Sequence, residues 1–98
     1  MKINKEAIAG TLESSDIQIT ISKNHLIKNT IYLESPVKHL YEVAIKKVIM
    51  NTLEKHQITN ANVKAIDQGA LDCTIIARTQ SAIYRATEKK EINWEAID

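Results

Sequence analysis

The chain has 98 residues, enough for one domain with a single modest core. Hydrophobic residues make up 44% and charged residues 26%, a globular composition that excludes a disordered chain. Thirteen basic and twelve acidic residues give a net charge of +1, which argues against a nucleic-acid-binding face.

The cysteine count limits the kinds of site that the chain can form, and the hydropathy pattern indicates its cellular compartment. The single cysteine, Cys73, excludes an intramolecular disulfide and a four-cysteine zinc site. The N-terminal residues lack the apolar region that a signal peptide needs. Apolar runs in the chain reach only three or four residues, too few to span a membrane. We therefore expect a cytoplasmic protein without membrane contact.

The first third of the chain is typical of strands. Residues 7–12 are small, apolar or β-branched, and in residues 17–22 isoleucines alternate with polar residues, the period of a half-buried strand. Between these runs, Ser14 and Ser15 predict an exposed hairpin tip, in a tight turn or a slightly wider loop, flanked by Glu13 and Asp16. Residues 31–34 read as a third strand.

A long helix follows. Ser35 and Pro36 suit the N-cap and the first helical position, and the pattern runs to about His56 or Gln57. Apolar residues recur at helical spacing on one face. They are Val37, Leu40, Tyr41, Ala44, Ile45, Val48, Ile49 and Leu53.

The second half predicts another hairpin and a short helix. Residues 62–66 form a strand pattern, Gly69 suits a turn with positive φ, and residues 71–77 alternate as a returning strand. Residues 79–87 fit a short amphipathic helix. The elements thus predict an α+β two-layer sandwich in the order β-β-β-α-β-β-α. Two helices would cover one face of an antiparallel sheet of about five strands. Residues 1–87 would form this domain, and residues 88–98 a C-terminal tail.

No group of residues predicts catalysis or metal binding. Cys73 alternates in phase with Leu71 and Ile75, which favours a buried core residue. The three histidines, at positions 25, 39 and 56, lack metal-ligand spacing, and Asp67 and Asp72 bracket a turn. Ser14 remains, an exposed hydroxyl on which another enzyme could install a group.

Several segments resemble one family over almost the whole chain. Residues 7–16 resemble the start of the citrate lyase acyl carrier protein, its gamma subunit. The run from Gly69 to Cys73, followed by Ala77 and Arg78, supports the likeness, as does Trp94 near the end. The family has glycine after its modified serine, where this chain has Ser15.

The resemblance implies a carrier that is not itself catalytic. Ser14 would bear 2′-(5″-phosphoribosyl)-3′-dephospho-coenzyme A through a phosphodiester, installed by a transferase from a triphosphoribosyl precursor with loss of pyrophosphate. An acetylating ligase would load its thiol. The thiol would hold acetyl and citryl groups as thioesters while the alpha and beta subunits of the lyase cleave citrate to acetate and oxaloacetate. Glu13 and Asp16 would repel the phosphodiester and turn the arm away from the carrier.

Other interpretations stay open. The carrier subunit of malonate decarboxylase bears the same kind of group, and an interaction module would leave Ser14 unmodified. Helical phosphopantetheine carriers fit poorly, because here the serine lies in a strand-rich region. In the tail, Ile92, Trp94 and Ile97 either fold back onto the domain or dock on a lyase subunit.

Overall fold

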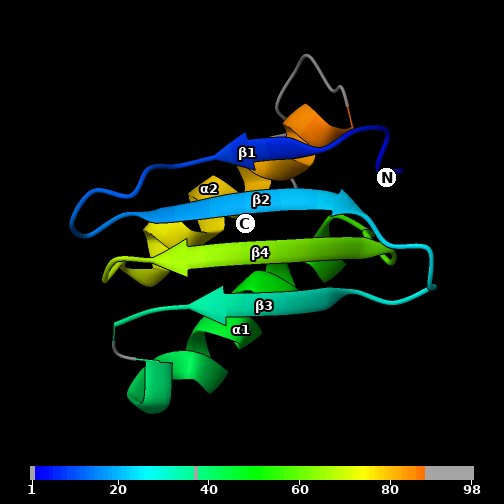
Figure 1. Ribbon diagram of the computed structural model, residues 1–98. Helices are drawn as coiled ribbons and strands as arrows, with labels where there is room; N and C mark the ends of the chain where they lie inside the picture. Colours follow the sequence, from blue (N-terminus) through cyan, green and yellow to red (C-terminus); the bar gives the residue numbers. More distant parts are fainter. Residues whose placement is uncertain (1, 37, 88–98) are drawn as a thin grey trace.

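The computed structural model describes residues 2–36 and 38–87, which form four strands and two helices (Figure 1). The elements are β1 (Ala7–Ala9), β2 (Ile17–Lys23), β3 (Thr30–Glu34), α1 (Lys38–Lys55), β4 (Ala61–Asp67) and α2 (Asp72–Ala86). The predicted α+β class is confirmed, and the predicted tail at 88–98 lies outside the described residues.

The sheet differs from the prediction in strand number and direction. It has four strands in the order β1-β2-β4-β3. The pairs β1–β2 and β2–β4 are antiparallel, but β3 and β4 run parallel. The prediction of an antiparallel sheet of about five strands is therefore wrong in strand number and in the direction of β3 relative to β4. The parallel pair arises because α1 connects β3 to β4, and a helical crossover returns the chain so that both strands run in one direction.

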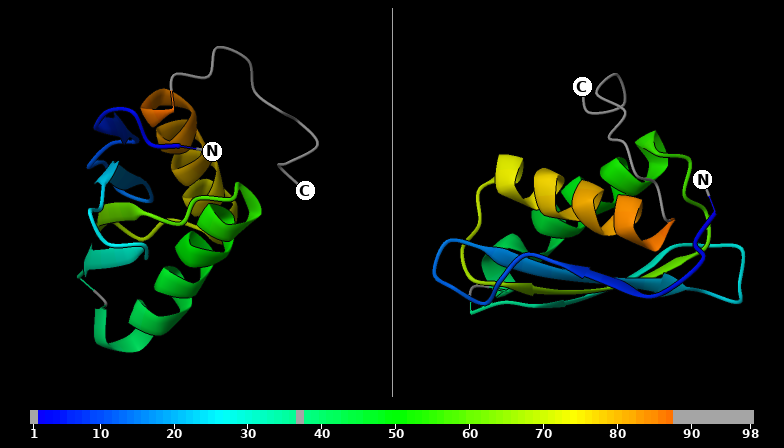
Figure 2. Two further views of the ribbon diagram at one scale, coloured as in Figure 1. Left: turned by 90° about the vertical axis from the view of Figure 1, so that its right-hand side faces the viewer. Right: turned by 90° about the horizontal axis from the view of Figure 1, so that it is seen from above.

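One face of the sheet carries the core. The alternation predicted for residues 17–22 is confirmed, with the isoleucines of β2 buried and the polar residues between them more exposed. Both helices lie on the same side of the sheet (Figure 2). The core between the helices and the sheet is mostly aliphatic. Its largest fully buried apolar side chains are Ile3, Ile17, Ile19, Ile21, Leu33, Ile49, Leu53, Ile58, Ile75 and Ile83.

Helix α1 begins at Lys38, later than the predicted start at Ser35 and Pro36. The Ser35 hydroxyl donates a hydrogen bond to Asp67 Oδ2 (3.0 Å), which ties the end of β3 to the end of β4. The apolar face of α1 is covered only toward its C-terminus. Leu40 is 77% exposed, while Leu53 is fully buried. The first turns of α1 thus leave apolar side chains in contact with solvent.

The largest correction concerns residues 71–77, which lie in or just before helix α2 and not in a strand. The helical pattern comes from the buried residues further along, which recur at spacings of three and four: Ile75, Thr79, Ala82, Ile83 and Ala86. The alternation that suggested a strand covers only the first turns, where Leu71 and Cys73 are exposed. The prediction that Cys73 is a core residue is therefore wrong as well.

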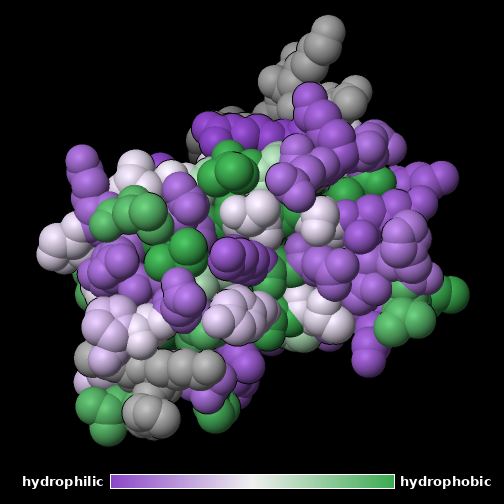
Figure 3. All heavy atoms as spheres, in the orientation of Figure 1, coloured by the Kyte–Doolittle hydropathy of each residue, from purple (hydrophilic) through white to green (hydrophobic). Residues whose placement is uncertain are grey.

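The other face of the sheet is open. Viewed from this side, the surface is largely hydrophilic or of middling hydropathy, with separate hydrophobic patches (Figure 3). Among the described residues, neither helix is long and apolar enough to cross a membrane.

Candidate functional site

The loop that joins β1 to β2 lies at one end of the sheet (Figure 1), and Ser14 belongs to this loop. The loop spans residues 10–16, so it is the wider of the two connections that the sequence left open. Ser14 and Ser15 are both exposed, as predicted. The Ser14 hydroxyl makes no hydrogen bond to any described residue, which leaves its oxygen accessible to another enzyme.

The tip is a four-residue turn. The Asp16 N–H donates to the carbonyl oxygen of Glu13 (3.1 Å), and Ser15 has a φ of 66°. Positive φ at the third residue is the signature of a type II turn, a position that favours glycine. Ser15 therefore occupies a glycine position, and Ser14 stands at the preceding corner.

Two backbone hydrogen bonds join this turn to the end of β4. The Ser15 N–H donates to the carbonyl oxygen of Gln68 (2.7 Å), and the Gln68 N–H donates to that of Asp16 (2.9 Å). They continue the β2–β4 ladder beyond the pair Ile17 and Asp67. The turn is thus anchored to the sheet on one side.

The Asp16 side chain anchors the turn on the other side. It is only 12% exposed and accepts hydrogen bonds from the backbone and hydroxyl of Thr11 (3.1 and 2.6 Å) and from the N–H of Ile17 (2.7 Å). Arg78 of α2 donates from Nε to Oδ1 and from Nη2 to Oδ2, each at 3.0 Å. The carboxylate therefore joins the start of the loop, the start of β2 and helix α2.

These contacts stabilise the ionised form of Asp16. The hydrogen bonds from Arg78, and then from Thr11, hold the pKa of the Asp16 carboxyl well below its usual range. The same pairing raises the pKa of Arg78. The expectation that Asp16 repels a group on Ser14 is therefore unsupported, because its charge is turned inward and paired. Glu13 remains exposed at the tip.

The other candidate residues lie away from the turn or serve structural roles. Asp67 is buried and accepts hydrogen bonds from Ser35 and from the N–H of Ala70 (3.0 Å), in keeping with a turn former. His25 is exposed in the β2–β3 loop, and His56 is buried at the end of α1 against the Tyr84 ring. No group of three or more metal-ligating side chains occurs among residues 2–36 and 38–87.

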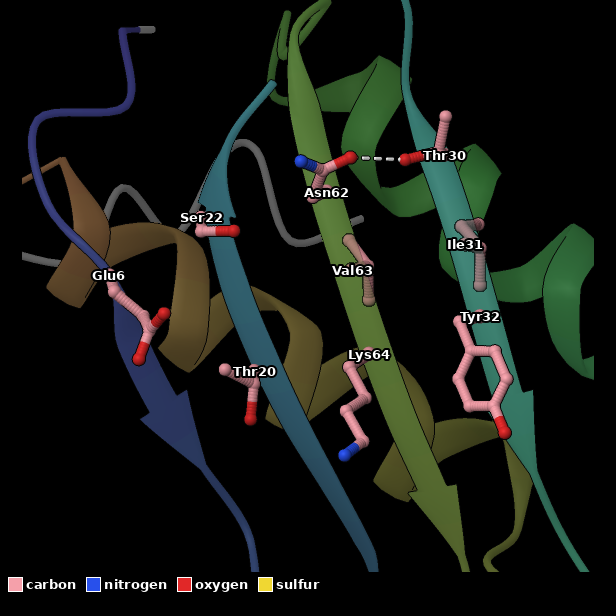
Figure 4. Close-up of a pocket in the computed structure, with 9 residues that line it drawn as sticks. All are labelled: Glu6, Thr20, Ser22, Thr30, Ile31, Tyr32, Asn62, Val63 and Lys64. Atoms are coloured by element: carbon pink, nitrogen blue, oxygen red, sulfur yellow. Dashed lines mark hydrogen bonds between the residues drawn. The ribbon is translucent and has the colours of Figure 1, made fainter. Parts of the chain in front are cut away.

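Two of the cavities that the described residues form have volumes of about 610 Å³ or more. One, of about 610 Å³, is lined by residues of α1 and α2 and by Gly69, Ala70 and Leu71. These three residues directly follow Gln68, whose backbone is hydrogen bonded to the turn. The other, about 680 Å³, is a groove on the open face of the sheet (Figure 4). There Thr20 and Lys64 lie on neighbouring strands, and the Thr30 hydroxyl is hydrogen bonded to Asn62. Ser14 lines neither cavity.

Sequence reasoning missed the partners of the turn. Gln68 and Arg78 are 52 and 62 residues beyond Asp16, and no local pattern connects them. An arginine within an amphipathic helix usually lies on its solvated face. Here its guanidinium reaches back to the loop, which only the packing of α2 across β1 and β2 makes possible.

Comparisons with known proteins agree on an acyl carrier. The acyl carrier protein family model described as "Malonate decarboxylase delta subunit (MdcD)" matches residues 4–86. Curated relatives of the chain, among them the following three, bear the name "Citrate lyase acyl carrier protein". The Oenococcus oeni protein is 53% identical over 99% of this chain and 100% of its own length. The Lactobacillus acidophilus protein is 56% identical over 93% of both chains, and the Streptococcus mutans protein 44% identical over 100% and 96%.

Proposed function

Because the chain belongs to the citrate lyase acyl carrier protein family, we propose that it is the carrier subunit of a citrate lyase, with Ser14 as its attachment site. The exposure of Ser14 at the corner of an anchored turn is the observation that carries this proposal. The chain is a carrier and not a catalyst, in line with the names of its relatives.

The site fits a phosphodiester-linked group. The Ser14 oxygen is open to solvent, and the nearest inward carboxylate, that of Asp16, is neutralised by Arg78. Ser15 offers a second exposed hydroxyl, but its backbone is held in the left-handed region and its N–H is bound to Gln68. We assign attachment to Ser14 because the corner position and the family likeness agree on it.

The attached group would be 2′-(5″-phosphoribosyl)-3′-dephospho-CoA, whose thiol supplies thioester chemistry for acetyl and citryl groups. The chain itself supplies a fixed starting point for that arm. Its turn is hydrogen bonded to β4 and to α2, so the arm moves while the turn stays in place. Tethering raises the effective concentration of the thioester at each partner's site, provided that the arm spans both.

The partners follow from the same assignment. They would be the alpha and beta subunits of the lyase, the transferase that modifies Ser14, and the acetylating ligase. An exposed apolar side chain in the loop supports such contacts, because Leu12 lies two residues before Ser14. It offers a partner an apolar contact within the loop that carries the attachment point.

A carrier subunit of malonate decarboxylase is the second candidate, because the matching family model bears that description. The curated relatives with 44–56% identity favour citrate lyase. Purified carrier, once modified, should restore citrate cleavage to alpha and beta subunits that lack their own carrier. Restoration of malonate decarboxylation alone would instead establish the second candidate.

Intact mass tests the attachment site. The full chain is produced together with the transferase and the enzyme that makes its triphosphoribosyl precursor, and its mass is compared with that of the chain produced alone. We expect a single defined increment that Ser14→Ala abolishes and Ser15→Ala retains. An increment that survives Ser14→Ala would move the site elsewhere. No increment in the wild type would favour an unmodified interaction module.

A further inference from the structure

The Asp16–Arg78 pair joins the Ser14 turn to a helix 62 residues away in sequence. Both bonds measure 3.0 Å and run in parallel from the guanidinium fork to the two carboxylate oxygens. Such bidentate pairs are stronger and more selective in geometry than a single ionic contact. A lysine could not reproduce the two parallel bonds.

The pair lies at a point where several parts of the loop meet. The same carboxylate holds Thr11 at the start of the loop and Ile17 at its end. The Arg78 Cδ also lies close to the backbone of Gly10, 3.2 Å from where a Cβ would stand. Removing the guanidinium would leave a buried carboxylate without its charged partner and would break the side-chain link between the loop and α2.

We propose that Asp16 and Arg78 are positioning residues that hold the Ser14 turn in the conformation that the modifying transferase recognises. This inference rests on the proposed function, since it concerns the same serine. Neither side chain is hydrogen bonded to the Ser14 hydroxyl. Their effect is to keep the fraction of molecules with a preformed turn close to one.

A positioning role has a kinetic signature. If the loop samples many conformations, the transferase binds only the competent fraction, and its apparent affinity falls by that fraction. Once bound, the serine reacts as before. Loss of the pair therefore raises KM for the carrier and leaves kcat within about twofold.

The experiment compares Arg78→Lys and Arg78→Gln with the wild type, each as the full, unmodified chain. Transfer from the triphosphoribosyl precursor is followed by intact mass at several carrier concentrations, which separates KM from kcat. Backbone amide exchange at residues 13–16 reports the order of the turn without any enzyme. Thermal unfolding verifies that each variant is folded at the assay temperature.

Two matched controls separate positioning from general stability. Arg85→Lys changes the other described arginine of α2, whose Nη1 donates to the carbonyl oxygen of Ile8 (2.6 Å) and not to the turn. Ile49→Val removes one methylene from a fully buried side chain of α1. Both should leave KM and the exchange of residues 13–16 within about twofold of wild type, even though Ile49→Val lowers the unfolding midpoint.

For Arg78→Gln we expect exchange at residues 13–16 to approach the rate of an unprotected peptide and KM to rise about tenfold, as when about one molecule in ten keeps the turn, with smaller changes for Arg78→Lys. Exchange that stays protected in a folded Arg78→Gln protein would show that the turn holds without the pair. Exchange at the unprotected rate with unchanged KM would show that the transferase does not need the preformed turn. Either result overturns the proposal while Ser14 attachment stands. A wild type that gains no mass overturns both.

Discussion

Gly10 and Ile17 lie at opposite ends of the Ser14 loop, and the backbone of Ile17 occupies the space that a side chain on Gly10 would need. A Cβ on Gly10 would stand 1.9 Å from the carbonyl oxygen of Ile17, far inside van der Waals contact. Gly10 also has a φ of +88°, in the region that favours glycine. The narrow neck of the loop therefore depends on the absence of a side chain at position 10.

Gly10→Ala should destabilise the fold strongly, by about 3 kcal/mol or more, because strain at positive φ adds to a clash with backbone that has no room to move. Urea unfolding of the full chain measures this. Gly69→Ala is the matched control, since Gly69 has a φ of +90° but nothing within 4 Å of an added Cβ. Its loss should be limited to about 1–2 kcal/mol of backbone strain. Equal losses at both positions would contradict the role of the Ile17 contact.

Ser15→Gly should stabilise the protein by up to about 1 kcal/mol, because it relieves a left-handed serine at φ 66° and the gain exceeds the added chain entropy of glycine. The free energy of unfolding in urea gives the value. Ser14→Gly is the control: it lies in the same turn without positive φ, so it should destabilise by about 0.5–1 kcal/mol. A Ser15→Gly protein that is less stable than wild type would show that the turn relaxes around serine.

His56 should make stability depend on pH. The residue is 3% exposed, and its ring packs edge-to-face against that of Tyr84, with ring centroids 5.4 Å apart. Burial, and then the charge of Lys55, lower the pKa of His56 below its usual value. A lowered pKa in the folded state means that the unfolded chain binds the proton more readily. The contribution is therefore fully present above about pH 6.5 and is lost as the pH falls below it.

Urea unfolding between pH 5 and pH 8 measures this dependence. In His56→Phe, which keeps a ring beside Tyr84 but does not titrate, the fall in stability between pH 7 and pH 5 should be smaller than in wild type. His25→Phe alters an exposed histidine of the β2–β3 loop and should leave the wild-type profile in place. A His56→Phe profile that matches wild type would assign the dependence to other groups.

Local patterns predicted the elements whose burial follows a simple period. The isoleucines of β2 and the alternation of β4 identified two neighbouring strands, and the long amphipathic run identified α1. The same reasoning failed at residues 71–77, where four alternating residues imitate a strand at the start of a helix. Such a short window fits either period, and the buried residues from Ile75 to Ala86 decide for the helix.

For the candidate site, the sequence by itself determined the exposed serines, the turn that carries them and the likeness to a family of carriers. It could not determine which way Asp16 faces, because a carboxylate beside a turn suits solvent as well as the interior. Only the tertiary structure decided this, by bringing Arg78 and Gln68 to the end of the loop that Asp16 closes. The parallel pairing of β3 with β4 was decided in the same way. The physical reason is shared: these contacts join residues far apart in sequence, and their energy depends on how the elements pack, which no local period records.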